Sequence, residues 1–190
     1  WQNAPNKRAD VALGSRSAKP VVYLVDRPDS GQSTILVAST QPPRNPAIDT
    51  RMSAFNALFG GNFTSRVNMN LREDKGWSYG SRSGFSGGRG PRTFTITAPV
   101  QTDATKGALV EVRKELTDIV GCKPPTAAEL NTVRTNSLLG MASRWETAGA
   151  VQSTLMDIDE FNLPADYWSN YAATYRAVTP ADVEAVAKAV

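Results

Sequence analysis

Arg72 and Tyr79 are the residues of this sequence whose side chains best suit chemistry on a polar substrate. Both belong to the charged segment 71–80, which follows the glycine-containing segment 60–66. Arginine offers a rigid fork of N–H donors, and tyrosine offers one O–H on a rigid ring. If a tight turn brings both to one end of a sheet, the pair suits a carbonyl or anionic oxygen that gains charge during a reaction.

The same two residues also allow a purely structural interpretation. Arg72 could pair with Glu73 or Asp74 at a surface turn, and Tyr79 could half-fill the core. On residue chemistry alone, this structural interpretation is favoured.

Composition excludes several catalytic devices, because the 190 residues include no histidine and one cysteine. A catalytic zinc site usually takes about three ligands, mostly His or Cys, and Ser-His-Asp or Cys-His catalysis needs an imidazole. The sequence therefore predicts no metal site of its own, and Cys122 has no partner for an internal disulfide. The net charge of +3 does not require a nucleic-acid partner, and no apolar run is long enough to span a membrane.

Two predicted elements must hold the segment that carries Arg72 and Tyr79. Asn45 as cap and Pro46 in the first turn predict a helix before it, which the pair Gly60-Gly61 ends. Segments 77–86 and 92–100 predict a hairpin after it, and apolar alternation in the second arm predicts one buried face.

The rest of the sequence completes an α+β fold. Two strands are expected at 21–25 and 33–39, on either side of a Pro/Gly turn. Helices are predicted downstream, over 102–121 with Leu109, Val112, Leu116 and Ile119 as its core stripe, from the capping box Thr126–Glu129 onward, over 147–161 and 167–176, and after Thr179-Pro180. This order predicts a two-layer sandwich of helices on a mainly antiparallel sheet.

Other segments carry weaker signals. Arg82 and Arg89 lie in the glycine-rich stretch 76–90, and with Arg92 they would give a nucleic-acid module with salt-sensitive binding, although the alternation favours an ordinary hairpin. The acidic run 157–160 lacks the glycine and spaced oxygens of a calcium loop. Three tryptophans are predicted to line the core or a cleft wall, namely Trp77, Trp145 and Trp168.

The string NMNLREDKGWSYG, preceded by LFGGNFTSR, resembles the C-terminal, non-zinc-binding domain of the M16 (pitrilysin/insulinase-like) zinc peptidases of the bacterial two-domain type. The resemblance covers roughly residues 20–190 and implies the M16 metalloenzyme (LuxS/MPP-like) fold. It leads us to interpret residues 1–19 as a linker from a missing N-terminal domain. Residues 20–190 are then the C-terminal-type domain, truncated before its last strand.

The resemblance also implies a function. In that family the N-terminal half carries Zn in an HxxEH motif, and the C-terminal half supplies an Arg/Tyr pair across the cleft. Arg72 and Tyr79 match the pair, Arg72 as substrate-binding residue and Tyr79 as substrate-binding and catalytic residue that stabilises the transition state. This sequence has no HxxEH, so it resembles the substrate-binding, non-catalytic half of a metalloendopeptidase, with no cofactor of its own.

The partners and the alternative follow from the same resemblance. The expected partners are a peptide substrate and a zinc-bearing M16 domain on the same chain; a dimer is compatible with the family, and nucleic acid is not expected. The chain alone should be proteolytically inert. The resemblance favours a periplasmic or membrane-associated bacterial protein. The alternative is a catalytically inactive scaffold subunit of the same fold, in which the Arg/Tyr match would be a relic.

Overall fold

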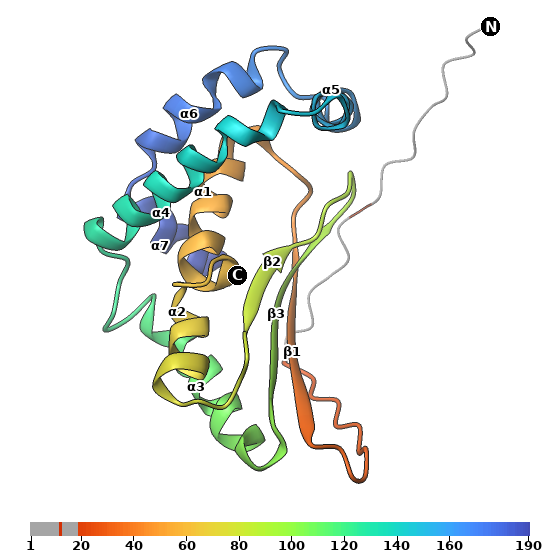
Figure 1. Cartoon of the computed structure of the whole chain (residues 1–190), viewed down its shortest axis with the longest axis vertical. Coiled ribbons are helices and arrows are strands. Elements are labelled where there is room, and N and C mark those ends of the chain that lie inside the picture. The colour runs from red at the N-terminus through yellow and green to blue at the C-terminus, as the bar shows by residue number, and fades with distance from the viewer. Residues whose placement is uncertain (1–11, 13–18) are drawn as a thin grey trace, which may run out of the picture.

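The computed structural model describes residue 12 and residues 19–190, which form helices packed on one face of a small antiparallel sheet (Figure 1). The sheet contains β1 (Gln32–Gln41), β2 (Arg82–Phe85) and β3 (Arg92–Gln101), with β3 in the centre. Both pairings are antiparallel, and Ile35 of β1 lies opposite Ala98 of β3. The predicted two-layer α+β class is therefore confirmed.

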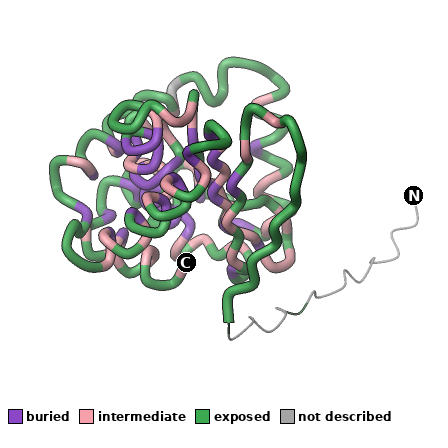
Figure 2. The backbone as a smooth tube through the Cα atoms, turned by 90° about the horizontal axis from the view of Figure 1, so that it is seen from below, coloured by how far each residue is buried: buried purple, intermediate pink, exposed green. Residues whose placement is uncertain are grey.

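Strand β3 shows how the sheet acquires its dry face. Its residues alternate between buried and half-buried along nearly the whole strand, as a period of two requires. The buried series is the one expected from the sequence, namely Phe94, Ile96, Ala98 and Val100. Figure 2 shows the buried residues gathered where the helices meet the sheet.

The helical path that leads to the Arg72 segment begins at a cap. The Asn45 side chain accepts a hydrogen bond from the amide of Ala47, and α1 (Pro46–Asn56) follows. A π-helical turn, Ala57–Gly61, continues α1 and ends at the predicted glycine pair. At Gly60 a Cβ atom would lie within 2.8 Å of three atoms of Ser83, so only glycine lets this turn approach β2 so closely.

After the short α2 (Arg66–Asn68) and a second π-helical turn, Met69–Asp74, the chain enters β2 and β3. The remaining helices form the rest of the layer: a 3₁₀ turn Thr102–Ala104, α3 (Thr105–Asp118), α4 (Ala127–Gly140), a 3₁₀ turn Ala142–Trp145, α5 (Ala148–Phe161), α6 (Tyr167–Ala177) and α7 (Pro180–Ala189). The predicted capping box of α4 is confirmed, since Thr126 and Glu129 bond each other's backbone amides. Thr179 caps α7 in the same way, with Asp182 as its partner.

Three details of the predicted elements are wrong. Residues 21–25 form no strand; their side chains are 61–91% exposed, and within the described residues β1 pairs only with β3. An apolar run becomes a strand only when a neighbour takes its backbone hydrogen bonds. The first hairpin arm is shorter than predicted, because residues 77–81 form a loop. Leu109 points away from the core, which takes Ala108 instead.

The linker interpretation of residues 1–19 falls almost wholly on residues 1–11 and 13–18, which lie outside the described part of the chain. At the other end of the domain, the Ser39 hydroxyl donates a hydrogen bond of 2.7 Å to the carbonyl of Val190. The end of α7 is therefore attached to β1.

Candidate functional site

Arg72 lies in the π-helical turn Met69–Asp74, with 37% of its side chain exposed. Its guanidinium carbon lies 4.3 Å from the centre of the Phe63 ring, and its Nε lies 3.3 Å from a carboxylate oxygen of Glu73. A guanidinium that stacks on a ring keeps its edge donors in one plane. Arg72 is therefore oriented by Phe63 while its outer part remains open to a ligand.

Tyr79 is 89% exposed in the loop before β2, so the interpretation in which it half-fills the core is wrong. The backbone around it is nevertheless anchored. The Ser78 hydroxyl donates to the carbonyl of Pro99 at 2.6 Å and accepts from the amide of Gly80 at 3.1 Å. The amide of Ser81 donates to Oδ1 of Asn68 at 2.9 Å. A fixed loop thus presents a large aromatic ring to solvent.

A closed turn joins the two residues. The amide of Gly76 donates to the carbonyl of Arg72 at 3.1 Å, and Gly76 has a φ of 66°, which suits glycine. The amide of Trp77 donates to the carbonyl of Leu71 at 2.9 Å, and its own carbonyl accepts from Gln101 at the end of β3. The structure therefore places both sides of the turn at the end of the sheet where β3 finishes. Among the described residues, no hydrogen bond or cation–π contact joins Arg72 to Tyr79.

Asn70 connects this turn to α3 through two hydrogen bonds. Its side-chain amide donates to carboxylate oxygens of Glu111 at 2.9 Å and of Glu115 at 2.7 Å. The hydrogen bond from Asn70 to Glu111 is the main reason that the pKa of Glu111 lies below its ordinary value. Asn68 and Asn70 were not predicted as supports of the site, although both stand in the string NMN, which only Leu71 separates from Arg72.

Arg66 attaches the same region to α4. Its Nε and Nη2 donate to the two carboxylate oxygens of Glu129, each at 2.8 Å, and its Nη1 donates to the carbonyl of Lys123. Burial acts to raise the pKa of Glu129, but the hydrogen bonds from Arg66 and Thr126 outweigh it and the pKa is lowered. The bidentate geometry makes this a strong attachment between distant segments.

The lowered pKa values predict acid sensitivity. A carboxylate with a folded-state pKa below its unfolded value stabilises the fold above the unfolded pKa, and this contribution disappears as pH falls through the folded pKa. For Glu129 and Glu111 the loss of stability should begin near the ordinary glutamate pKa of 4.5 and continue below it. We expect urea midpoints to fall between pH 6 and pH 3 and the Glu129→Gln variant to show a shallower fall. An equally steep fall in that variant would show that the attachment does not contribute.

The structure does not support the arginine-rich hairpin or the acidic run 157–160 as binding sites. Arg92 is buried against Asp49 and cannot contact a nucleic acid together with Arg82. Asp157, from the acidic run, pairs with Arg144. Within residues 12 and 19–190, no group of three potential ligands lies close enough to hold a metal ion. Of the tryptophans, Trp77 packs on the core, whereas Trp145 lies at the surface.

The Arg72–Tyr79 turn can donate hydrogen bonds to an oxygen, and its setting is a two-layer α+β domain. A family model described as "Peptidase M16 inactive domain" matches residues 1–137 of the 190. The chain therefore belongs to the M16 peptidase family, as an inactive domain. Among curated protein sequences, none matches this chain.

Solved structures agree with this fold. The peptidase M16 inactive domain from Pseudomonas fluorescens superimposes with a TM-score of 0.75 at 23% identity, over 83% of this chain and 37% of that one. For a protease from Helicobacter pylori the TM-score is 0.76 at 16% identity, over 87% and 40%. For the inactive peptidase domain of a protein from Bordetella parapertussis it is 0.68 at 18% identity, over 87% and 90%. This chain thus spans well under half of the first two structures.

Proposed function

We propose that this chain is the substrate-binding, non-catalytic half of a zinc-dependent metalloendopeptidase and that it supplies Arg72 and Tyr79 to the cleft opposite an HxxEH site. One observation carries the proposal: Tyr79 is almost fully exposed although the loop on both sides of it is anchored by hydrogen bonds. Leaving a tyrosine ring in water gives the fold no packing energy. A partner that covers the ring explains why the loop is built to present it.

The roles of the two residues follow from their donors. The Tyr79 hydroxyl donates a hydrogen bond to the oxygen of the scissile carbonyl as it becomes an oxyanion. The Arg72 guanidinium, held flat on Phe63, donates to a backbone carbonyl of the peptide and so fixes its position. Zinc in the other half would activate the attacking water. This chain has no histidine and, among its described residues, no cluster of metal ligands, so its own contribution is to bind and orient the peptide and to stabilise the oxyanion through Tyr79.

A structural role on the same fold is the second candidate. A chain of complex III from Candida albicans shares the fold with a TM-score of 0.66 at 10% identity. In a scaffold, Arg72 and Tyr79 would only support assembly. An HxxEH motif in the half that precedes this domain supports the peptidase, whereas its absence supports the scaffold.

The proposed partners are a peptide and a zinc-bearing M16 domain on the same chain, and a dimer is compatible with both. We also propose a periplasmic or membrane-associated location. A structural neighbour with a TM-score of 0.67 at 14% identity is the periplasmic protease PqqL from Escherichia coli. No helix in the described part of this chain is long and apolar enough to cross a bilayer.

Cleavage of a quenched fluorescent peptide library tests the proposal on the protein that joins this chain to its HxxEH half. We expect cleavage that a chelator abolishes and added zinc restores, because the reaction depends on the metal. This chain alone, as the matched control, should neither cleave the library nor bind stoichiometric zinc. A well-folded two-half protein that cleaves nothing would contradict the peptidase and favour the scaffold.

A further inference from the structure

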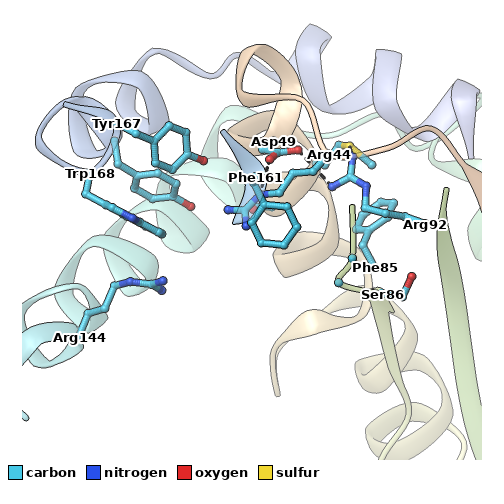
Figure 3. Close-up of a pocket in the computed structure, with 14 residues that line it drawn as sticks. Arg44, Asp49, Phe85, Ser86, Arg92, Arg144, Phe161, Tyr167 and Trp168 are labelled. Carbon is cyan, nitrogen blue, oxygen red and sulfur yellow. Dashed lines mark hydrogen bonds and ion pairs between the residues drawn. The ribbon is translucent and has the colours of Figure 1, made fainter. Parts of the chain in front are cut away.

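A second site lies at the other end of β2 from Tyr79. It is a cavity of about 280 Å³ between the start of α1, the tip of the β2–β3 hairpin, the end of α5 and the start of α6. Figure 3 shows Arg144 and Trp168 on one side of this space, Arg44 and Phe161 in the middle, and Arg92 on the hairpin side. Three arginines and a single carboxylate, that of Asp49, line the cavity.

The charges inside the cavity do not balance. The Asp49 carboxylate receives Nε of Arg44 at 2.8 Å on one oxygen and Nη1 of Arg92 at 3.1 Å on the other. The side chains of Asp49 and Arg92 are each only 8% exposed. One carboxylate therefore serves two guanidiniums. The carbonyls of Pro42 and Pro43 also accept from Arg92, so the group keeps one net positive charge, with Arg44 as its more exposed guanidinium at 21%. A net positive charge in a partly enclosed site attracts an anion.

Arg144 adds a further positive charge at the rim. Its Nη2 lies 3.4 Å from a carboxylate oxygen of Asp157, and both side chains are partly exposed, so this pair is weak. Its guanidinium carbon lies 3.8 Å from the centre of the Trp168 ring, just as that of Arg44 lies 4.4 Å from the centre of the Phe161 ring. These cation–π contacts hold both guanidiniums beside the cavity, where the N–H groups that Asp49, Tyr167 and Asp157 do not use can bind a ligand.

One buried hydrogen-bond donor of the cavity lacks an acceptor. The indole N–H of Trp168 is buried and has no hydrogen-bond partner among the described residues. Burial raises the pKa of Tyr167 and of Tyr171, so both phenols remain protonated at neutral pH, and each already has a hydrogen-bond partner, Arg44 for Tyr167 and Ser53 for Tyr171. A buried donor without a partner costs free energy that an acceptor on a ligand can recover. A group with acceptor oxygens only, such as a carboxylate, meets this requirement.

The volume of the cavity limits the size of the group that it can bind. Sites for whole small molecules usually occupy about 300–1,000 Å³, so about 280 Å³ holds one residue of a longer ligand. Aromatic rings supply the apolar part of the wall, where a short methylene chain can pack. From Tyr79 to Ser86 at the cavity, the chain covers at most roughly 23 Å, at about 3.3 Å per residue if fully extended. A peptide of about eight residues can therefore span both sites.

We propose that this cavity is a subsite for a peptide carboxylate, either an acidic side chain or a free carboxyl terminus, which Arg44, Arg144 and the indole N–H of Trp168 bind. The choice of a peptide rests on the proposed function, whereas the need for an anion rests on the cavity alone. The subsite would select substrates by a residue about seven positions from the one at Tyr79.

Binding to this chain tests the proposal without any cleavage. Three peptide probes differ only in their carboxylate: Ac-Ala-Ala-Glu-Ala-Ala-NH₂, its glutamine counterpart, and the glutamine peptide with a free carboxyl terminus. Inorganic phosphate is the fourth probe. Isothermal titration gives their affinities, and the indole N–H resonance of Trp168, identified with Trp168→Phe, reports the place of binding. We expect the glutamate peptide, the free-carboxyl peptide or both to bind and shift this resonance, while the neutral peptide does neither. The peptide that binds identifies the source of the carboxylate.

Variants give the matched comparison. Arg144→Gln should weaken carboxylate binding about tenfold or more, since it removes a charged hydrogen bond. Arg176→Gln removes the same charge from an exposed site outside the cavity and should leave binding unchanged. The readout is binding at Trp168 and not cleavage, so a failure here leaves the proposed function of Arg72 and Tyr79 untouched, and a failure of the cleavage test leaves this result untouched. Equal binding of the neutral peptide, no effect of Arg144→Gln, or equally tight binding of inorganic phosphate would overturn the proposal.

Discussion

Replacing Tyr79 with phenylalanine in the protein that joins this chain to its zinc-bearing half is expected to lower kcat about 10²- to 10³-fold. The substitution removes one hydroxyl and keeps the ring. Loss of one oxyanion donor usually raises the barrier by about 2.7–4 kcal/mol. Steady-state kinetics on a peptide that the protein cleaves, together with metal analysis of the same samples, measure the effect.

The fold should not respond to this change. Tyr79 is 89% exposed, and no hydrogen bond of the described residues involves its hydroxyl, so zinc content and the unfolding midpoint should remain unchanged. Tyr23→Phe is the matched control, because Tyr23 is also a highly exposed tyrosine, at 86%, and lies outside the turn. An unaltered rate in Tyr79→Phe, or an equal loss in Tyr23→Phe, would reject the catalytic assignment of Tyr79.

Local signals made much of the fold predictable. The Asn45 cap, the Thr126–Glu129 capping box and the alternation in β3 each depend on residues close together in the sequence, and the structure contains all three. The strand predicted at 21–25 is absent because strand formation does not depend on local residues alone. Its apolar composition fits a strand, but strand formation also requires a neighbouring strand, which no local pattern shows.

The Arg72–Tyr79 turn and the arginine-lined cavity also differ in whether their residues are close together in the sequence. Arg72 and Tyr79 are seven residues apart within one motif, so a resemblance could point to them. The exposure of Tyr79 was not predictable, because whether an aromatic ring packs depends on the elements around it. The cavity gathers Arg44, Arg92 and Arg144 from three distant segments. Only the folded chain brings their charges together.

Replacing Asp49 with asparagine should lower the free energy of unfolding by about 3–5 kcal/mol. The change is nearly isosteric, but it removes the only carboxylate that lines the cavity and leaves two guanidiniums without it. Removing one partner of a buried ion pair is costly because the remaining charge stays desolvated. Urea unfolding of the purified chain, followed by circular dichroism, measures the loss.

Two comparisons show whether charge imbalance is the cause. Asp26→Asn makes the same chemical change at an exposed position and should alter stability by less than about 0.5 kcal/mol. Arg44→Met should cost less than Asp49→Asn, because it leaves Asp49 and Arg92 as a balanced pair. If Arg44→Met is instead the more damaging variant, the excess positive charge is already compensated, and the cavity loses its reason to bind an anion.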